Sequence, residues 1–489
     1  MKSRFMAIFA ILSIVSCLFA SCGAAADKDA PKTTEGEPNS TSEPLGEYVF
    51  PNLDCGGIDF TILNAINEWA FYSDIAFENM TGEALDDAIY KRNRMIEEKF
   101  NVNIKEAPAQ VVGALGQKLR NAVLSGEDIY DAAFCPSVET GALLAEGMLH
   151  NLNKAPGLNL GENWWNQSVM ASAAIGSSKS VYFAFSDMDI FTLQCAWCIF
   201  INEKMITDLG LARPYELVKG GKWTYDKFYE YMMAGAQLNG ADSFKWQSDG
   251  PAVYGYTSFS SGTRALLTGS GENMVAADAK GMPYLTLKNE RFYNVCDKLG
   301  AMLNTKASGG YEDANDYHTP YHFEAMFENS RAFMMGGELK AANSIRGMET
   351  AFGILPMPKY DEIQGRYCTA ITVWAPVMVV PATNGNLERT GAIMDALAYV
   401  SAKDVTPIFF DVCVSQKQLR NDESIEMLQI IRDTLLFDIG YAYGWTNSMA
   451  DLIVETLNRG RSSNIASIIE KQIDKAQANI DKMMGLIEN

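Results

Sequence analysis

Residues 81–100 read Thr81-Gly-Glu-Ala-Leu-Asp-Asp-Ala-Ile-Tyr-Lys-Arg-Asn-Arg-Met-Ile-Glu-Glu-Lys-Phe100, and Val102-Asn-Ile-Lys105 follows directly. Apolar residues in the first stretch recur at helical spacing, which predicts an amphipathic helix with Thr81 as its N-cap. These apolar residues are Leu85, Ile89, Met95 and Ile96. The alternating apolar residues after the helix predict a short strand over residues 102–105.

The alternation of strand and helix continues on both sides of this stretch. A strand is expected over residues 58–63, which are rich in β-branched and aromatic side chains. The elements expected downstream are a helix near 115–125, a strand over 130–134 and a helix over 141–146, capped at Ser137 and stopped at Gly147. Successive β-α-β units predict a parallel sheet that is covered by helices.

A second block of alternating elements is predicted from about Asp187 onward. Its clearest parts are a buried strand over residues 193–201 and a helix over 223–232 with Thr224 as N-cap. Residues 286–345 are expected to be mostly helical. The later elements expected are strands over 352–358 and 377–380, and helices over 387–400 and through most of 424–488.

The first residues of the chain resemble an export signal. Lys2 and Arg4 precede an almost purely apolar run over residues 5–20, and small residues follow. A basic start, a short apolar core and a small-residue end are typical of a secretory signal peptide, which we expect over residues 1–21.

A cysteine directly after the small residues resembles a bacterial lipobox. Cys22 is therefore the expected lipidation site; Cys17 fits the local pattern as well, and a plain secreted protein is the alternative. Residues 22–49 are polar and poor in aromatic side chains, so they are expected to form a flexible tether. Such a tether would hold a globular body at the membrane surface.

Composition limits the classes of partner. The chain has 60 acidic and 40 basic residues, a formal net charge of −20. Repulsion from such a surface disfavours nucleic acid and anionic lipid. Its 489 residues are too many for one hydrophobic core, so two or three domains are expected. No segment after the signal is long and apolar enough to cross a membrane.

Cys195-Ala-Trp-Cys198 is a C-x-x-C pair. A redox role needs a helix N-terminus that lowers the thiol pKa. The apolar neighbours instead predict a buried strand, on which residues three apart face opposite sides. We therefore favour two core cysteines over a redox pair. Neither a metal ion nor a cofactor is expected, because none of the histidines has a C-x-x-C partner at metal spacing. The histidines are His150, His318 and His322.

Several segments resemble, in order, those of bacterial extracellular solute-binding proteins, the receptor subunits of ABC importers. The most specific match is Phe200-Ile-Asn-Glu-Lys-Met-Ile-Thr-Asp-Leu-Gly-Leu211 with Pro214-Tyr-Glu-Leu-Val-Lys-Gly-Gly-Lys-Trp-Thr-Tyr-Asp226. The other matching segments are the 81–100 helix, residues 130–152, Phe327-Glu-Asn-Ser-Arg-Ala-Phe-Met-Met-Gly-Gly337 and Phe352-Gly-Ile-Leu-Pro-Met-Pro-Lys359. Their order over about residues 50–440 points to the carbohydrate-type branch, family 1.

The resemblance implies an α/β, two-lobed, periplasmic-binding-protein-like (type II) fold with a ligand cleft between the lobes. Lobe I would comprise residues 50–187 and 351–401, and lobe II residues 188–350 and the helical part 402–489. The resemblance also implies a monomer that is lipid-anchored at the extracytoplasmic face of the cell membrane. Such a protein would carry a small-molecule ligand, a carbohydrate, to ABC permease subunits.

A saccharide presents C–H faces that stack on aromatic rings, and hydroxyls that need paired donors and acceptors. In open α/β sheets, ligands lie beyond the carboxyl ends of the strands. Trp69, which follows the first strand, is therefore a candidate ligand contact. Ser137 and Glu139, at the start of a helix, are candidates too. Glu139 has the alternative role of complementing the helix dipole.

The remaining candidates come from loops and aromatic clusters. For Asp187 and Asp189, at the first predicted crossing between the lobes, cleft lining and turn chemistry are open alternatives. Glu338 follows Gly336-Gly337, where the family often brings backbone close to ligand and often carries Trp. Tyr441-Ala-Tyr-Gly-Trp445 either stacks a sugar or forms a satellite core. The further candidates are Trp246, Arg264, Trp374, Tyr441, Tyr443 and Trp445; Trp164, Trp165 and Trp223 are assigned to packing.

These observations favour a binding protein without chemistry of its own. A surface-anchored enzyme acting on glycans is the first alternative, because glycoside hydrolysis needs only two suitably spaced carboxylates and acidic residues abound. No nucleophile elbow, phosphate loop or metal-binding helix is present in the sequence. A purely structural or adhesive surface lipoprotein is the second alternative.

Overall fold

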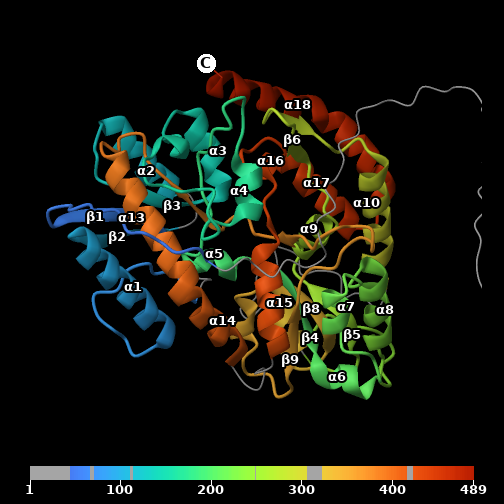
Figure 1. Ribbon diagram of the computed structural model, residues 1–489. Helices are drawn as coiled ribbons and strands as arrows, with labels where there is room; N and C mark the ends of the chain where they lie inside the picture. The colour runs from blue at the N-terminus through green and yellow to red at the C-terminus, as the bar shows by residue number, and fades with distance from the viewer. Residues whose placement is uncertain are drawn as a thin grey trace, which may run out of the picture. The chain divides into compact units, whose positions relative to one another are not determined.

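Two four-stranded β-sheets organise the structure (Figure 1). This computed structural model describes residues 45–66, 71–110, 114–247, 249–305, 322–415 and 422–488. Several predictions fall outside the described residues. These are the signal peptide with Cys17, the lipidation site Cys22, residues 22–44 of the tether, Trp69 and His318.

The first sheet contains the predicted β-α-β units. Its strands, in the order β11-β3-β1-β2, are β1 (Ile58–Ile66), β2 (Val102–Gln110), β3 (Ala132–Pro136) and β11 (Pro376–Val379). β1 runs parallel to β2 and to β3, whereas β11 is antiparallel to β3. The helices packed around this sheet are α1 (Ala84–Phe100), α2 (Ala114–Ser125), α3 (Ser137–Ala145) and α13 (Leu387–Val400) (Figure 1). The parallel sheet is confirmed, with one antiparallel edge strand from a distant part of the chain.

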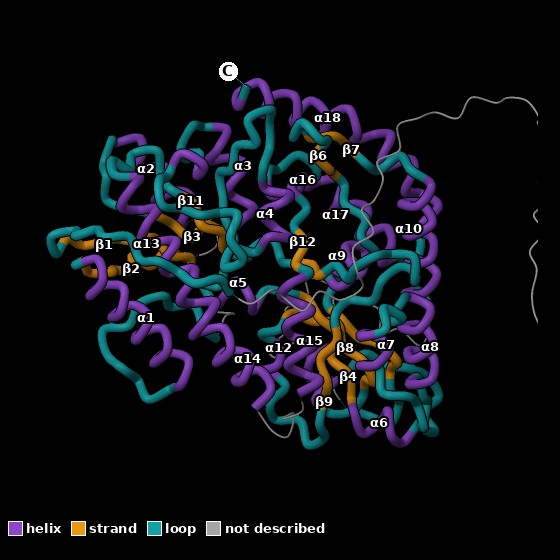
Figure 2. Tube along the Cα trace, in the orientation of Figure 1, coloured by secondary structure: helices purple, strands orange, loops and turns teal. Residues whose placement is uncertain are grey.

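The second sheet mixes strand directions. Its strands, in the order β5-β8-β4-β9, are β4 (Trp197–Asn202), β5 (Tyr254–Ser258), β8 (Ala332–Glu338) and β9 (Phe352–Leu355). β5 and β8 are parallel, and β4 is antiparallel to both β8 and β9. The helices packed against its strands include α6 (Glu203–Asp208), α8 (Tyr225–Gly235), α11 (His322–Glu328) and α15 (Asp422–Asp433). Figure 2 shows these strands as a group separate from the first sheet.

The remaining helices and two small sheets complete the described chain. The other helices are α4 (Gln167–Ala173), α5 (Ile190–Gln194), α7 (Tyr215–Lys219), α9 (Gly262–Gly269), α10 (Glu290–Leu303), α12 (Ala341–Ser344), α14 (Thr406–Ser415), α16 (Ile439–Ala442), α17 (Asn447–Asn458) and α18 (Ile465–Ile487), with single turns η1 (Leu152–Lys154), η2 (Ser401–Val405) and η3 (Ser462–Asn464). Two small sheets pair β6 (Val275–Ala277) with β7 (Pro283–Leu285) and β10 (Thr369–Ala370) with β12 (Leu435–Leu436).

Two chain segments that pass between the sheets lie side by side. The first is residues 195–196, which join α5 to β4. Helix α5 still belongs to the first sheet's side, because the Thr192 hydroxyl donates to the Pro376 carbonyl of β11 (2.9 Å). The second runs from β9 to β11, and its Thr372 N–H donates to the Cys195 carbonyl (3.1 Å). The predicted boundaries at 187 and 351 therefore do not coincide with the passages, since α5 packs on the first sheet and β9 pairs with β4 in the second.

Several local predictions need correction. Helix α1 begins at Ala84, with Glu83 at the N-cap, because the Thr81 hydroxyl accepts the Glu83 N–H instead of capping a longer helix. The predicted strand over 193–201 is the end of α5 followed by β4. Ser137 is the first residue of α3, not a cap before residue 141. Strand β8 lies inside residues 286–345, which were expected to be mostly helical.

The predicted packing residues lie in the core. Trp164, Trp165 and Trp223 are buried, as predicted. Cys195 and Cys198 are also buried, and burial raises the pKa of both thiols well above the ordinary value. A redox pair needs the opposite shift, so the structure supports two core cysteines.

The close approach of α3 to the segment after α16 gives a testable consequence. A Cβ added to Gly141 would lie 2.5 Å from the carbonyl carbon and oxygen of Tyr443. Ala normally stabilises a helix over Gly by about 0.5–1 kcal/mol, but here the two backbones would have to separate. We expect Gly141→Ala to lower the free energy of unfolding by about 1–3 kcal/mol, measured by urea unfolding.

A glycine in an open helical position is the matched control. No atom lies within 4 Å of a Cβ added to Gly485 of α18. Gly485→Ala is therefore expected to be neutral or stabilising. A Gly141→Ala protein as stable as Gly485→Ala would contradict the tight contact with Tyr443.

Candidate ligand-binding site

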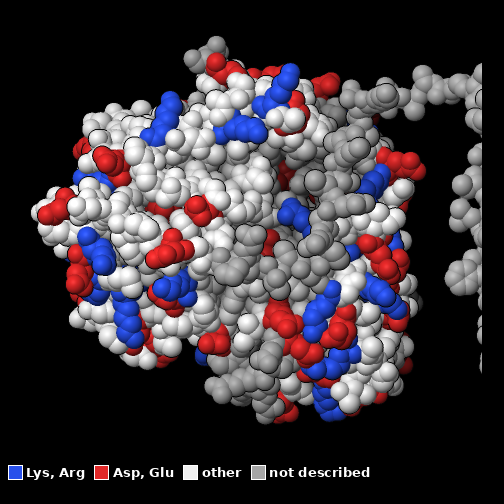
Figure 3. Space-filling view, viewed as in Figure 1, with Lys and Arg blue, Asp and Glu red and all other residues white. Residues whose placement is uncertain are grey.

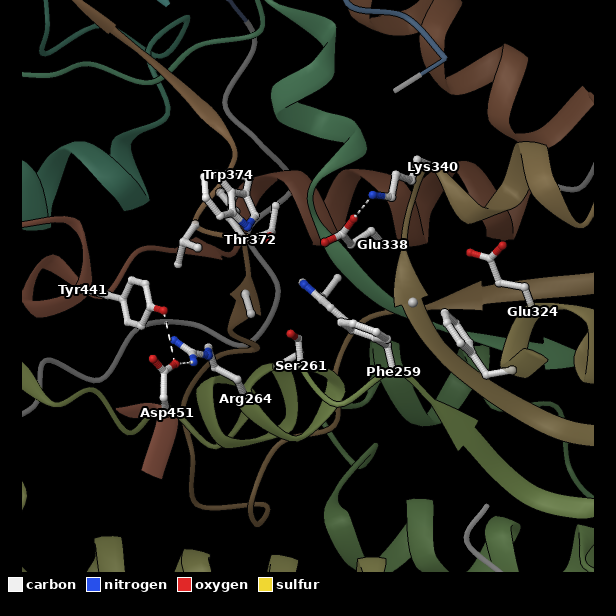
Figure 4. Close-up of a pocket in the computed structure, with 17 residues that line it drawn as sticks. Phe259, Ser261, Arg264, Glu324, Glu338, Lys340, Thr372, Trp374, Tyr441 and Asp451 are labelled. Atoms are coloured by element: carbon white, nitrogen blue, oxygen red, sulfur yellow. Dashed lines mark hydrogen bonds and ion pairs between the residues drawn. The ribbon is translucent and has the colours of Figure 1, made fainter. Parts of the chain in front are cut away.

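A cavity of about 240 Å³ opens beside the second sheet. It lies at the carboxyl ends of the parallel strands β5 and β8, which the chain reaches at Ser258 and Glu338. Loops at this edge of an α/β sheet are the usual place for a ligand. Its wall also includes the passage from β10 to β11 and residues of α9, α16 and α17. Figure 4 shows the lining side chains.

Aromatic rings form much of the lining. Trp374, Tyr441 and Phe259 line the cavity and are partly buried, and Trp197 and Phe323 line it as well and are buried. Trp374 and Phe259 lie on opposite sides of the cavity in Figure 4. Flat apolar faces of this kind suit the C–H faces of a sugar ring.

One ion pair closes an end of the cavity. Arg264 Nη2 lies 2.5 Å from Asp451 Oδ1, and the guanidinium carbon lies 4.3 Å from the centre of the Tyr441 ring. The Tyr441 hydroxyl donates to the same carboxylate (3.3 Å). Burial raises the pKa of Tyr441, and the Arg264 charge opposes this rise. The three side chains form one hydrogen-bonded group, which Figure 4 shows on one side of the cavity.

A second ion pair lies on the other side of the cavity. Lys340 Nζ is 2.6 Å from Glu338 Oε2, and both side chains are largely buried. Glu324 also lines the cavity. The lining therefore holds the three carboxylates of Glu324, Glu338 and Asp451 against the two cations of Arg264 and Lys340. Charged groups held in pairs offer both donors and acceptors to the hydroxyls of a neutral ligand.

The segment that carries Trp374 is fixed by the first turn of α3, which packs on the first sheet. The Ser137 hydroxyl and the Val138 N–H both donate to the Val373 carbonyl, at 2.8 and 3.1 Å. The neighbouring Thr372 N–H donates to Cys195, as described above. Ser137 is buried and is not part of the lining. It positions the wall that presents Trp374.

Four of the predicted ligand contacts come together in this cavity: Arg264, Glu338, Trp374 and Tyr441. Trp69 lies outside the described residues. The other candidates lie outside the lining. Glu139 accepts the Gly116 N–H in the first turn of α2 (2.8 Å), and Trp246 packs edge-on against Tyr254.

Asp187 and Asp189 are both buried. Asp187 pairs with Arg432 (2.7 Å), whereas Asp189 is the N-cap of α5 and accepts the Phe191 N–H (2.9 Å). Burial raises the pKa of Asp189 well above its ordinary value. Neither carboxylate lines the cavity. The capping role of Asp189 agrees with the turn-chemistry alternative, whereas the buried ion pair of Asp187 is neither of the two alternatives.

The aromatic cluster after α15 divides between the two alternatives. Tyr441 lines the cavity, whereas Tyr443 and Trp445 are buried in the core and stack on each other with ring centres 5.0 Å apart.

The neighbouring glycines Gly336 and Gly337 of β8 have different roles. A Cβ on Gly336 would collide with the Tyr256 hydroxyl at 2.1 Å, so this glycine serves packing, and Gly337 lines the cavity.

Sequence reasoning missed several lining residues: Phe259, Ser261, Glu324, Lys340, Thr372 and Asp451. Phe259 and Ser261 follow β5, whose run Tyr254-Gly-Tyr-Thr-Ser258 is aromatic and β-branched and had the signal of a strand. Asp451 lies inside α17, where a single carboxylate resembles any exposed helix residue. No sequence signal distinguishes it.

The face of the molecule drawn in Figure 3 carries charges of both signs. Acidic and basic side chains are intermixed over the face in Figure 3, so the net charge of −20 does not gather in one acidic field on the described part of this face. Among the described residues, no group of three or more His, Cys, Asp and Glu is placed to hold a metal ion. Within the same ranges, every helix is too short or too polar to span a bilayer.

By sequence, no protein-family model and no curated protein matches the chain. Solved structures match its fold. The cyclo/maltodextrin-binding protein complexed with maltotetraose is 11% identical, with 87% of this chain and 96% of that chain covered and a TM-score of 0.54.

Two further structures give the same result. The cyclic α-maltosyl-1,6-maltose binding protein from Arthrobacter globiformis is 13% identical over 88% of this chain and 100% of that chain, with a TM-score of 0.57. A sugar transporter from Rhizobium etli, in an open conformation, is 11% identical over 88% of this chain and 99% of that chain, with a TM-score of 0.52. This chain therefore has the two-domain α/β fold of these saccharide-binding proteins, which is the two-lobed fold that its sequence predicted.

Proposed function

We propose that this protein is the extracytoplasmic solute-binding lipoprotein of an ABC importer, and that it captures a sugar or oligosaccharide and delivers it to a membrane permease. The observation that supports this proposal most is the lining of the 240 Å³ cavity. Trp374, Tyr441 and Phe259 supply ring faces, and two ion pairs supply donors and acceptors. Saccharides are recognised by this combination of stacking and paired hydrogen bonds.

The fold relatives support the ligand class. One of them is complexed with maltotetraose, and another binds cyclic α-maltosyl-1,6-maltose. The passages between the sheets, with Thr372 hydrogen-bonded to Cys195, provide a hinge region beside the cavity. A ligand that contacts both lobes would favour their closed arrangement by its differential affinity.

The proposal includes anchoring and delivery. Cys22 would carry the lipid, and residues 22–49 would tether a monomeric body to the outer face of the cell membrane. A permease that recognises the closed, ligand-bound form would then receive the sugar. Metabolic labelling with a radioactive fatty acid tests the anchor, because Cys22→Ala should abolish labelling while Cys17→Ala leaves it unchanged.

Binding without chemistry fits the cavity better than glycoside hydrolysis does. Glu338 and Asp451 each hold a cation at 2.6 and 2.5 Å. A glycosidase instead needs two carboxyl groups that are free to act on the scissile bond, and of the three carboxylates in this lining two are already paired with cations. We expect no turnover of a chromogenic glycoside panel. Cleavage of any member would favour the enzyme.

Ligand-dependent stabilisation tests the proposal directly. We expect saturating cognate saccharide to raise the melting temperature by about 3–5 °C, because a ligand at a hundred times its Kd adds about 2.7 kcal/mol. The screen should compare malto-, xylo- and cello-oligosaccharides with polyols, amino acids and peptides. Native mass spectrometry of protein purified from rich medium should show a bound mass of whole sugar units. Stabilisation by amino acids or peptides alone would contradict the proposal.

A further inference from the structure

The main cavity has a smaller neighbour. A second cavity, of about 50 Å³, lies beyond the Arg264–Tyr441 pair. The two cavities share Arg264, Tyr441 and the backbone stretch around Ile371 and Val373 as lining. These shared residues form a wall with a hollow on each side. The space beside β5 and β8 is thus divided into a main chamber and an inner chamber.

The contacts of the Arg264 side chain hold this wall together. Arg264 stacks on the Tyr441 ring at 4.3 Å and pairs with Asp451 at 2.5 Å. Its side chain is 25% exposed and that of Asp451 is 59% exposed. The Arg264 Nη1 atom is sealed from solvent and has no hydrogen-bond acceptor in the described part of the chain. The guanidinium is thus held in the part of the lining that the two cavities share.

The inner chamber has the character of a ligand subsite. Leu267 and Met274 give it apolar walls, and Thr268 and Asp438 supply oxygen atoms. Asp438 already accepts the N–H groups of Met274 and Gly440, both at 2.8 Å. Polar groups fixed in an apolar pocket are the usual composition of a binding site.

The inner chamber is too small to take a sugar ring while the wall stands. At roughly 10–15 Å³ of such space for each water molecule, 50 Å³ corresponds to only a few waters. Each water has one non-hydrogen atom, and a hexose unit has about ten, so a hexose unit needs more space than the inner chamber offers. Removing the Arg264 side chain beyond Cβ would merge this space with the 240 Å³ chamber.

We infer that Arg264 is a specificity-determining residue that limits how many sugar rings the cleft accepts. With Arg264 stacked on Tyr441, an oligosaccharide ends at the wall; without it, one more ring enters the inner chamber. This inference rests on the proposed function, because it concerns the length of the saccharide and not the occurrence of binding.

The test is a length series measured by isothermal titration calorimetry. The probes are linear malto-, xylo- and cello-oligosaccharides from disaccharide to hexasaccharide, used with the full chain. For wild type, affinity should rise with length and then stop rising. For Arg264→Ala, it should continue to rise for one further ring, by about tenfold, because each ring adds many contacting atoms.

Two matched variants separate chamber size from charge. Arg264→Met removes the charge but keeps most of the side-chain volume and can still pack against the Tyr441 ring, so its length limit should equal that of wild type. Lys340→Ala removes the other cation of the lining without touching the inner chamber, and should change affinity for all lengths alike. Melting temperatures close to wild type confirm that each variant is folded.

The possible results separate the role of Arg264 from saccharide binding itself. A length limit that moves only in Arg264→Ala supports the wall. An unchanged limit in Arg264→Ala, the same shift in Arg264→Met, or complete loss of binding in Arg264→Ala overturns it, while the proposed function stands. Wild-type protein that binds no saccharide of any length overturns the proposed function, and the wall with it.

Discussion

Asp187→Ala is expected to lower the free energy of unfolding by about 3–5 kcal/mol, because it strands a buried cation. Asp187 is 1% exposed, and its Oδ2 accepts from Arg432 Nε at 2.7 Å and from the Thr406 hydroxyl at 2.8 Å. The Arg432 side chain is 12% exposed and would keep only a 3.3 Å contact with Asp433. Because Arg432 lies on α15, the loss would also loosen α15 from the segment before α5.

Urea unfolding followed by circular dichroism measures this effect against an exposed control. Lys204 and Asp208 form an ion pair of 2.5 Å, but their side chains are 61% and 55% exposed. Lys204→Ala should therefore cost less than about 0.5 kcal/mol. If Asp187→Ala lowered the free energy of unfolding no more than Lys204→Ala, the buried Asp187–Arg432 ion pair would not stabilise the fold as proposed.

Trp374→Ala is expected to weaken saccharide binding by about 2–3 kcal/mol, roughly a 30- to 160-fold higher Kd. Trp374 supplies a large ring face to the cavity, and the Ser137 and Val138 hydrogen bonds to Val373 fix the backbone beside it. A rigidly held aromatic residue loses little entropy when a ligand binds, so its truncation removes most of its contact energy.

Calorimetry with the saccharide identified in the screen measures this loss. Trp246 is the matched control, because it is partly buried and packs against Tyr254 outside the cavity. Trp246→Ala should leave the Kd within about twofold of wild type. Equal losses in both variants would show that the effect is a general one on folding and not the loss of a ring face from the site.

The elements with strong local signals were predictable from the sequence. The helix expected over 387–400 is observed as α13 (Leu387–Val400), with the Asn386 side chain capping the Arg389 N–H (3.0 Å). Thr224 occupies the predicted N-cap position of α8. The β-α-β units of the first sheet also followed from the periodicity of their helices, because α1 and α2 each bury one face and expose the other.

The second sheet was harder to predict because its strands are buried on both faces. β8 is buried over Ala332–Gly337, so it shows no alternation of apolar and polar residues, and its Gly336-Gly337 pair is unusual in a strand. Its partners β4 and β5 are distant in sequence. β10 and β12 have two residues each, which is too short for any periodic pattern.

The candidate site was predictable in part, from residue type. Arg264, Glu338, Trp374 and Tyr441 were chosen because sugars need rings and charged groups, and all four line the cavity. The sequence could not separate Tyr441 from Trp445, four residues away, since only tertiary packing decides which ring faces the cavity. Asp187 and Asp189 resembled loop carboxylates in the sequence. Both are buried in the structure, where Asp187 pairs with Arg432 and Asp189 caps α5.

A crystal structure with the cognate saccharide would show where the ligand lies. The protein would be crystallised with the sugar that native mass spectrometry identifies. We expect electron density for sugar rings in the main chamber, against Trp374 and Tyr441, with hydroxyls hydrogen-bonded to the Glu338–Lys340 and Arg264–Asp451 pairs. Density for the sugar at another place, with this chamber filled only by water, would contradict the proposed site.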